Sequence, residues 1–265
     1  IRNRYMIGPE QTPFGKAQSG EAAPICPSPA ALQRLKPCAM LRQIRGPLPR
    51  PESFLMSYLD FDALARTPLQ RDPYDWIIVE NFIKPDHFKD VSKDYPKVPG
   101  PGSHPPAELS IEGHFSALMD ELLGEEFKKL VEEKFDIDLT DRPTMYTVRG
   151  FVRQRDGEIH TDSKTKLITV LLYMNEGWEA DGGRLRILRS GTNLDDYVAE
   201  VPPYGGTLLM FRRADNSWHG HAPSEGPRRA IQLNWVTSQD VVEREQSRHS
   251  FSTKLKKVAG ALFGR

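Results

Sequence analysis

The sequence predicts a mainly β domain with supporting helices, and three observations lead to this prediction. From Met145 onwards, short apolar segments alternate with turn-forming pairs such as Asp156-Gly157. Upstream, apolar residues recur at steps of three and four over residues 115–135, which indicates an amphipathic helix. Because the helical segments precede the strands, we expect the helices to cover one face of a β-sandwich or barrel.

The composition excludes several classes of protein. The 265-residue chain has 36 Lys and Arg and 36 Asp and Glu, so its formal charge gives no general attraction to nucleic acid or anionic membranes. No apolar window reaches the length of a membrane span, and no secretory signal is recognisable. The two cysteines, Cys26 and Cys38, are not in metal-binding spacing. We therefore expect a cytoplasmic protein without a nucleic-acid partner.

Four segments are expected along the chain. Residues 1–52 are rich in Pro and lack a hydrophobic period, so they are expected to form a disordered extension. Residues 53–144 should supply an N-terminal strand and the buttressing helices of the catalytic unit. Residues 145–240 should form the β core, and residues 241–265 a polar, basic tail.

The individual elements follow from local patterns. The N-terminal strand is expected over Trp76–Ile83, followed by a helix that begins at Pro85. One long helix is expected over 115–135. The strands predicted for the core are Met145–Arg153, Lys166–Met174, Gly183–Leu188, Tyr197–Val201, Thr207–Phe211, Trp218–His221 and Arg229–Val236.

A histidine and a carboxylate occur two positions apart in His160-Thr-Asp162. In a strand, such residues project from the same face. A third ligand is available downstream, where His219 and His221 compete. Two histidines and one carboxylate on one face of a metal leave its other positions open, which is the facial triad of non-haem Fe(II) oxygenases. Alone, the His160–Asp162 pair is a weak signal, since such pairs also occur on ordinary surface strands.

An arginine near the end of the core is the second chemical signal. The segment up to Trp235 reads as a strand in which Arg229 shares a face with Ile231 and Leu233. An arginine among inward-facing apolar residues is costly without a partner, and its guanidinium matches a carboxylate in bidentate fashion. The distal carboxylate of 2-oxoglutarate is one candidate, and an internal salt bridge is the alternative. A slip of one residue would exchange Arg229 for Arg228.

The order of these motifs resembles the prolyl 4-hydroxylase-like Fe(II)/2-oxoglutarate dioxygenases. The matching motifs are His160-Thr-Asp162, Leu-Leu-Tyr173-Met-Asn, Gly182-Gly183-Arg-Leu-Arg-Ile, Gly-Thr-Leu-Leu-Met-Phe211, Trp-His219, and Arg229 with Trp235 six positions later. The resemblance implies a double-stranded β-helix (jelly roll) with the metal at its mouth. It implies Fe(II) as cofactor, 2-oxoglutarate and O2 as co-substrates, and it allows ascorbate as a further cofactor.

The resemblance also implies roles for single residues. Arg229, assisted by the Tyr173 hydroxyl, would bind the distal carboxylate of 2-oxoglutarate. In the family, the ligand histidine directly follows Trp or Pro at the start of its strand, which favours His219 over His221 as the third ligand. The spacing of six residues to Trp235 favours Arg229 over Arg228. Many relatives carry a tyrosine about nine positions before the first histidine, which contacts the co-substrate, whereas this chain has Phe151 near that place and so lacks the hydroxyl.

The function implied is hydroxylation of an unidentified substrate, with succinate and CO2 as co-products. Related halogenases lack the carboxylate that Asp162 supplies here. The substrate is a peptidyl proline, an amino acid or another small molecule. Two alternatives remain at this stage: a cupin-like metal-binding jelly roll that does not use 2-oxoglutarate, and a non-catalytic binding module.

Overall fold

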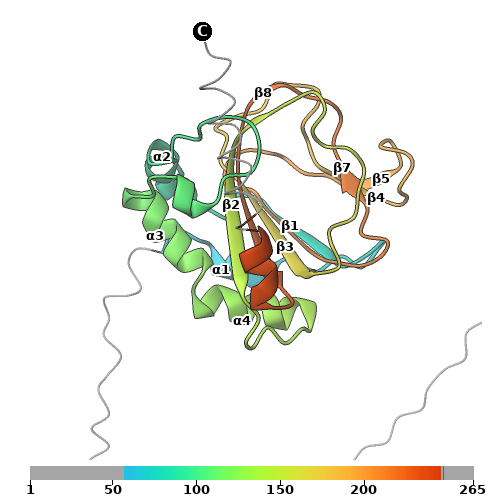
Figure 1. The fold of residues 1–265 in the computed structure, drawn as a ribbon, viewed down its shortest axis with the longest axis horizontal. Coiled ribbons are helices and arrows are strands. Elements are labelled where there is room, and N and C mark those ends of the chain that lie inside the picture. Colours follow the sequence, from blue (N-terminus) through green and yellow to red (C-terminus); the bar gives the residue numbers. More distant parts are fainter. Residues whose placement is uncertain (1–56, 246, 248–265) are drawn as a thin grey trace, which may run out of the picture. The chain divides into compact units, whose positions relative to one another are not determined.

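The computed structural model describes residues 57–245 and residue 247. The extension expected over residues 1–52 and most of the tail expected from residue 241 lie outside the described residues. Within the described chain, two antiparallel β-sheets lie beside a set of helices (Figure 1).

The larger sheet has five strands in the order β1-β6-β3-β8-β2, and all its pairs are antiparallel. Its strands are β1 (Trp76–Val79), β2 (Thr144–Val152), β3 (Lys166–Tyr173), β6 (Leu208–Arg212) and β8 (Gly226–Val236). The smaller sheet has the order β5-β4-β7, formed by β5 (Tyr197–Glu200), β4 (Arg186–Leu188) and β7 (His219–Gly220). A core that includes Leu171, Leu209 and Ile187 joins the two sheets. This arrangement is the predicted jelly roll.

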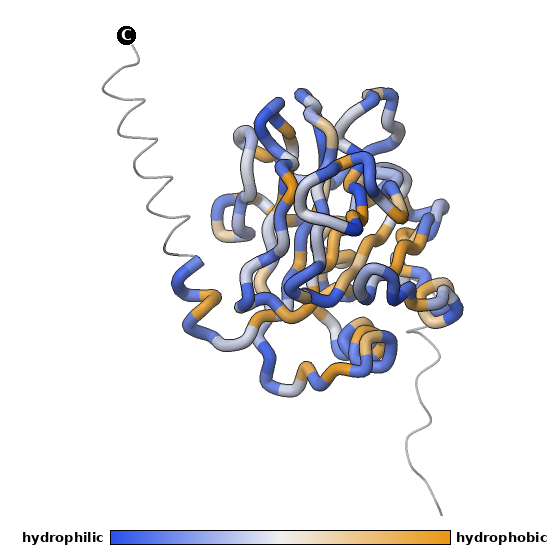
Figure 2. Tube along the Cα trace, turned by 90° about the vertical axis from the view of Figure 1, so that its right-hand side faces the viewer, coloured by the Kyte–Doolittle hydropathy of each residue, from blue (hydrophilic) through white to orange (hydrophobic). Residues whose placement is uncertain are grey.

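The helices cover the other face of the larger sheet (Figure 1). They are α1 (Phe61–Arg66), α2 (Pro85–Lys93), the short 3-10 helix η2 (Pro106–Glu108), α3 (Gly113–Leu122) and α4 (Glu125–Phe135). Their apolar sides form one continuous core with β1, β3, β6 and β8, in which Phe115 and Phe127 are fully buried. Figure 2 shows the apolar residues gathered along these strands and the facing helix sides. The prediction that helices buttress one face of the β unit is confirmed.

The prediction of one long helix over residues 115–135 was wrong, because two helices occupy this segment. The α3 helix ends at Leu122, and Gly124 then turns the chain in an extended conformation before α4 begins. Leu123 falls in the predicted apolar stripe but is 43% exposed at this break. The period of three and four continues across the turn because both helices pack against the same core.

The strand predictions were correct in number and order, with differences at the ends. All three strands of the smaller sheet are shorter than expected: β4 begins at Arg186, β5 ends at Glu200, and β7 contains only His219 and Gly220. Beyond β8, residues 239–245 are helical, and Val241 and Val242 pack against Val236. Ordered structure therefore extends into the segment expected to be a tail.

The strand β8, which lies between β3 and β2, is buried on both faces. Ile231, Leu233 and Trp235 belong to the core shared with the helices, and the Trp235 ring lies 6.0 Å from that of Phe127. Ala230 belongs to the core between the two sheets. Burial on both faces removes the polar–apolar alternation that would show which face lines a site.

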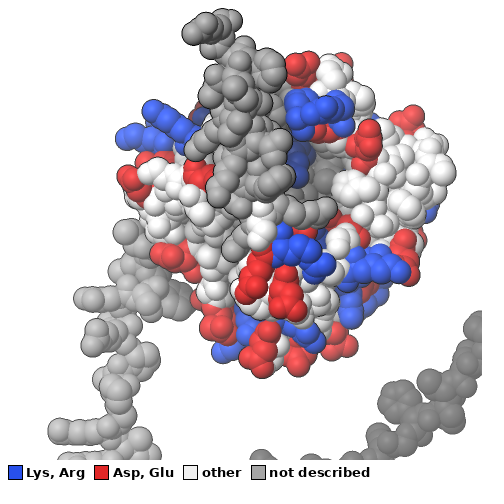
Figure 3. Space-filling view, viewed as in Figure 1, with Lys and Arg blue, Asp and Glu red and all other residues white. Residues whose placement is uncertain are grey.

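The surface agrees with the balanced composition. Figure 3 shows acidic and basic side chains intermingled over the face drawn. Among the described helices, none is both long and apolar enough to cross a lipid bilayer.

Candidate metal centre

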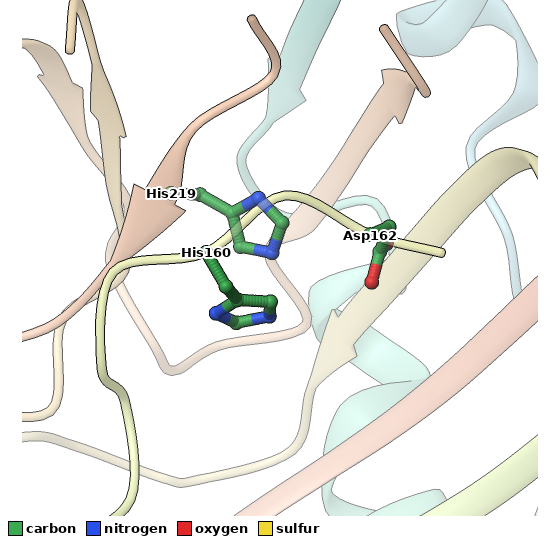
Figure 4. Close-up of side chains that lie close together, drawn as sticks. All are labelled: His160, Asp162 and His219. Carbon is green, nitrogen blue, oxygen red and sulfur yellow. The ribbon is translucent and has the colours of Figure 1, made fainter. Parts of the chain in front are cut away.

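Three side chains predicted as metal ligands converge at one end of the space between the sheets. One ligand atom each from His160, Asp162 and His219 lies within 4.8 Å of the others. Figure 4 shows the three side chains turned toward one another, with His219 on β7 and the other two on the segment that leads into β3. Asp162 and His219 are buried, whereas His160 is exposed, so the centre is open on one side.

The two histidines are brought together by their own backbones. The His160 N–H donates to the His219 carbonyl and the His219 N–H donates to the His160 carbonyl, each at 3.0 Å. This pair is an isolated bridge, and the segment 160–162 is not a strand. The expected convergence is therefore present, but it does not arise from strand alternation as predicted.

Backbone carbonyls set the protonation of both rings. His160 Nδ1 lies 2.8 Å from the Glu158 carbonyl oxygen, and His219 Nδ1 lies 3.0 Å from that of Ser217. Because a carbonyl only accepts, each Nδ1 carries the hydrogen and each Nε2 keeps its lone pair for a metal. Burial lowers the pKa of His219 to about 4, despite the nearby Asp162 carboxylate, so this ring is neutral at physiological pH.

Asp162 is held by donors from β3. Lys166 Nζ donates to its Oδ1 at 2.8 Å, and the Thr169 hydroxyl donates to its Oδ2. Asn234 Nδ2 donates in turn to the Thr169 hydroxyl at 2.8 Å. Burial alone would raise the pKa of Asp162, but Lys166, His219 and these hydrogen bonds outweigh it and lower the pKa. The carboxylate is therefore ionised and fixed in orientation.

His221 is not part of the convergent group. Its ring is buried above Gly157, and its Nδ1 donates to the Ala222 carbonyl at 2.9 Å. Of the two histidines that compete in the sequence, the structure brings only His219 to His160 and Asp162 among the described residues.

Arg229, the residue expected to bind the co-substrate, lies on the helix side of β8. Arg229 does share a face with Ile231 and Leu233, but that face packs against the helices. Arg229 is exposed, and its guanidinium lies over the Tyr95 ring and reaches the Ser92 carbonyl oxygen at 3.4 Å.

Arg228 instead points to the interior. It is 6% exposed, and its Nε donates to the Gly183 carbonyl at 2.9 Å. Its guanidinium lies 5.1 Å from the centre of the Tyr173 ring and donates to the Tyr173 hydroxyl at 3.3 Å. Tyr173, predicted for the co-substrate site, is therefore placed beside Arg228 and fully buried.

A pocket of about 320 Å³ lies beside the triad. It is lined by His160 and Asp162, by Lys166 on β3, by Thr147 and Arg149 on β2, and by Gln232 on β8. Phe151, which the sequence placed near the co-substrate, is 41% exposed and does not line it.

Sequence reasoning missed Arg149, Lys166, Thr169 and Asn234. A signal existed for Arg149 and Lys166, because each is a cation inside or at the edge of an apolar strand, which was the argument applied to Arg229. Thr169 and Asn234 gave no signal, since threonine and asparagine between apolar residues are common.

The donor set fits a divalent metal of the iron group. Two imidazole Nε2 atoms and one ionised carboxylate suit Fe(II), and a facial arrangement leaves positions open for further ligands. A jelly roll with such a triad between its sheets has the donor set that mononuclear non-haem Fe(II) enzymes use.

Comparisons with known proteins give the family. Residues 144–237 match the model of the 2OG-Fe(II) oxygenase superfamily. This segment is similar to the 2OG-Fe(II) oxygenases, a family that uses Fe(II) and 2-oxoglutarate. The resemblance of the motifs is confirmed. No curated protein matches the chain.

Solved structures that match the chain include three prolyl hydroxylases. One from Pseudomonas putida is 19% identical, with a TM-score of 0.42, over 66% of this chain and 90% of that chain. One from Phytophthora capsici is 16% identical, with a TM-score of 0.46, over 69% and 68%. One from Trichoplax adhaerens, in complex with a peptide fragment of hypoxia inducible factor, is 16% identical, with a TM-score of 0.39, over 66% and 88%.

Proposed function

We propose that this protein hydroxylates a C–H bond of an organic substrate, with Fe(II) held by His160, Asp162 and His219. The observation that supports this most directly is the convergence of the three ligand atoms within 4.8 Å. When bound together, Fe(II) and 2-oxoglutarate supply the oxidising chemistry, which consumes O2 and releases succinate and CO2 as a substrate C–H bond is hydroxylated.

The chain's own residues prepare the centre. The Glu158 and Ser217 carbonyls hold both imidazoles in the tautomer that a metal requires. Lys166 and Thr169 keep the Asp162 carboxylate ionised and oriented. With Asp162 present, the open positions serve the co-substrate and O2, and hydroxylation is the expected outcome.

Arg228, rather than Arg229, is the residue that we propose for the distal carboxylate of 2-oxoglutarate. It is buried, it lies beside the Tyr173 hydroxyl, and both groups can donate to the same carboxylate. A dicarboxylate with its distal carboxylate at Arg228 and its other end at the triad would lie along the inner face of the larger sheet.

A matched pair of variants tests this assignment, because the two arginines are neighbours in the chain. Arg228→Met should weaken binding of 2-oxoglutarate to the Mn(II)-loaded protein by roughly 30-fold or more, since a buried charge pair is lost. Arg229→Met should change it less than about twofold, because its guanidinium lies on the helix side. Calorimetric titration measures both, and metal affinity should be unchanged in each variant.

The alternatives give different results in the same titrations. A wild-type protein that binds the metal but not 2-oxoglutarate would be a cupin-like metal protein. One that binds neither would be a non-catalytic module. Loss of binding in Arg229→Met but not in Arg228→Met would contradict the face assigned here to β8.

The substrate is proposed by class only: a peptidyl proline, an amino acid or another small molecule. Succinate formed by the Fe(II)-loaded protein with each class of candidate measures coupling to hydroxylation. Succinate that never rises above the substrate-free level with any of them would argue against a hydroxylase of these classes.

A further inference from the structure

Arg149 is a partly buried cation whose Nε has no hydrogen-bond partner among the described residues. It lies in the middle of β2, and its Nε is sealed from solvent and makes no hydrogen bond. No carboxylate among residues 57–245 forms an ion pair with it, and burial lowers the pKa of Arg149, with Arg228 adding to the effect. An isolated charge of this kind is costly unless a ligand supplies the missing anion.

The two carboxylates whose charges act most strongly on Arg149, those of Asp156 and Asp162, are already engaged. Asp156 accepts from Arg153 through Arg153 Nε and its NH2 group at 2.9 Å, and from the Arg153 backbone N–H. Asp162 accepts from Lys166 and Thr169 and faces the metal position. A structural salt bridge within this part of the chain therefore does not account for Arg149.

The register of the sheet places Arg149 between the metal centre and Arg228. Arg149 lies directly opposite Ala230 on β8, and opposed residues project to the same side. That side is the space between the sheets, because Ala230 belongs to its core. Along β8, Arg228 lies on one side of Ala230, and Asn234, which supports the metal carboxylate through Thr169, lies on the other.

Arg149 also lines the pocket beside the triad, together with His160 and Asp162. Arg228 does not line that pocket. A dicarboxylic acid that extends from the metal to Arg228 passes Arg149 on its way, with one carboxylate at the metal end and the other at Arg228.

We propose that Arg149 binds the metal-end carboxylate of the 2-oxo acid co-substrate, so that two arginines hold its two carboxylates. The proposal rests on the proposed function, in which Arg228 takes the distal carboxylate. It makes Arg149 a residue that selects a 2-oxo acid at the metal end, whereas Arg228 selects for the second carboxylate. The guanidinium supplies the Nε–H donor that is unsatisfied in the free protein.

A pair of ligands separates the two arginines. 2-Oxopentanoate has the carbon chain of 2-oxoglutarate without the distal carboxylate. With the Mn(II)-loaded protein, Arg149→Met should weaken binding of both ligands by a similar factor of roughly 10- to 100-fold. Arg228→Met should weaken binding of 2-oxoglutarate only. Calorimetric titration gives all the dissociation constants without turnover.

Arg153→Met is the matched control. Arg153 follows the same strand, is paired with Asp156, and its side chain is 40% exposed, so its replacement removes an equal charge near the pocket. Both ligands should bind this variant as they bind the wild type. An equal loss in Arg153→Met and Arg149→Met would show a general effect of net charge and overturn the proposal.

The remaining outcomes are distinct. If Arg149→Met loses affinity for 2-oxoglutarate alone, Arg149 serves the distal carboxylate, and the assignment to the metal end is wrong. If neither ligand is affected, Arg149 serves the organic substrate or the fold, and the proposal is also wrong. A wild-type protein that binds the metal but not 2-oxoglutarate would overturn the proposed function itself.

Stability provides a second readout that a structural arginine would not give. Because the buried Nε of Arg149 lacks a hydrogen-bond partner, Arg149→Met should raise the thermal midpoint of the metal-free protein relative to the wild type. Saturating Mn(II) and 2-oxoglutarate should reverse this order, because only the wild type gains the additional contact. A variant less stable than the wild type in the free state would show that Arg149 is already satisfied.

Discussion

The hydrogen bond from Thr169 to Asp162 gives the sharpest test of how the metal centre is supported. The Thr169 hydroxyl donates to Asp162 Oδ2 and accepts from Asn234 Nδ2 at 2.8 Å. Thr169→Val keeps the shape of the side chain but removes both interactions. The Asp162 carboxylate then keeps Lys166 as its side-chain donor, and the Asn234 amide loses an acceptor.

The magnitude follows from the burial of these groups. A hydrogen bond to a charged group contributes about 1.5–3 kcal/mol, and 1.4 kcal/mol corresponds to a factor of ten. Thr169 is 2% exposed, so solvent does not replace the lost donor. Metal affinity should therefore fall by roughly 10- to 100-fold, in the range typical for residues that orient a metal ligand.

Thr207→Val is a matched control. Thr207 is also 2% exposed, and its hydroxyl donates to the Tyr204 carbonyl at 2.7 Å, with no contact to the triad. It should lose about 1 kcal/mol of stability but keep its metal affinity. The metal affinity of both variants is measured by competition with a chelator, in which bound Mn(II) is followed by electron paramagnetic resonance. Metal affinity within twofold of wild type in Thr169→Val would refute the reasoning, as would an equal loss in Thr207→Val.

Three further outcomes follow from the same structure. His219 has a pKa of about 4 in the folded protein and 6.5 when exposed, so the unfolded chain binds more protons between these values. From pH 7 to pH 4, urea unfolding of the metal-free wild type should therefore lose roughly 3 kcal/mol more stability than that of His219→Gln. Gly157 has a φ of +92°, and a Cβ there would overlap the His221 ring. Gly157→Ala should therefore lose roughly 1–3 kcal/mol of stability and bind the metal more weakly in chelator competition. Gly177 lies in open space, so Gly177→Ala should change neither stability nor metal affinity. Phe127→Ala should cost about 3–5 kcal/mol in denaturant unfolding while the folded fraction keeps its metal affinity, because Phe127 packs only on the helix side.

The sequence predicted the order of the strands and the three convergent ligands because these depend on local signals. Turn-forming pairs mark the strand ends. The His160–Asp162 pair alone was a weak signal, and the choice of His219 as third ligand came from the resemblance of the motifs to a known family. The prediction of one long helix failed at Gly124. The turn there leaves both helices packed on the same core, so the hydrophobic period continues across it and does not reveal the break.

The choice between Arg228 and Arg229 could not be made from the pattern. Arg229 is in phase with Ile231 and Leu233, as predicted, and an apolar face suggested the interior of the jelly roll. Because β8 is buried on both faces, the more apolar face belongs to the helix side, and the less apolar one lines the centre. Only the tertiary arrangement of helices and sheets distinguishes them.

The triad also joins two parts of the domain that otherwise share few backbone hydrogen bonds. His219 belongs to the smaller sheet, and its backbone pairs with that of His160, whereas Asp162 is tied by side chains to β3 of the larger sheet. An ion bound by all three is thus a cross-link between the sheets. Removal of the ion should leave β7, a strand of only two residues, as a freely opening edge. Amide protons of β7 and β4 should therefore exchange with solvent much faster in the chelated protein, while those of β3 and β8 keep their protection.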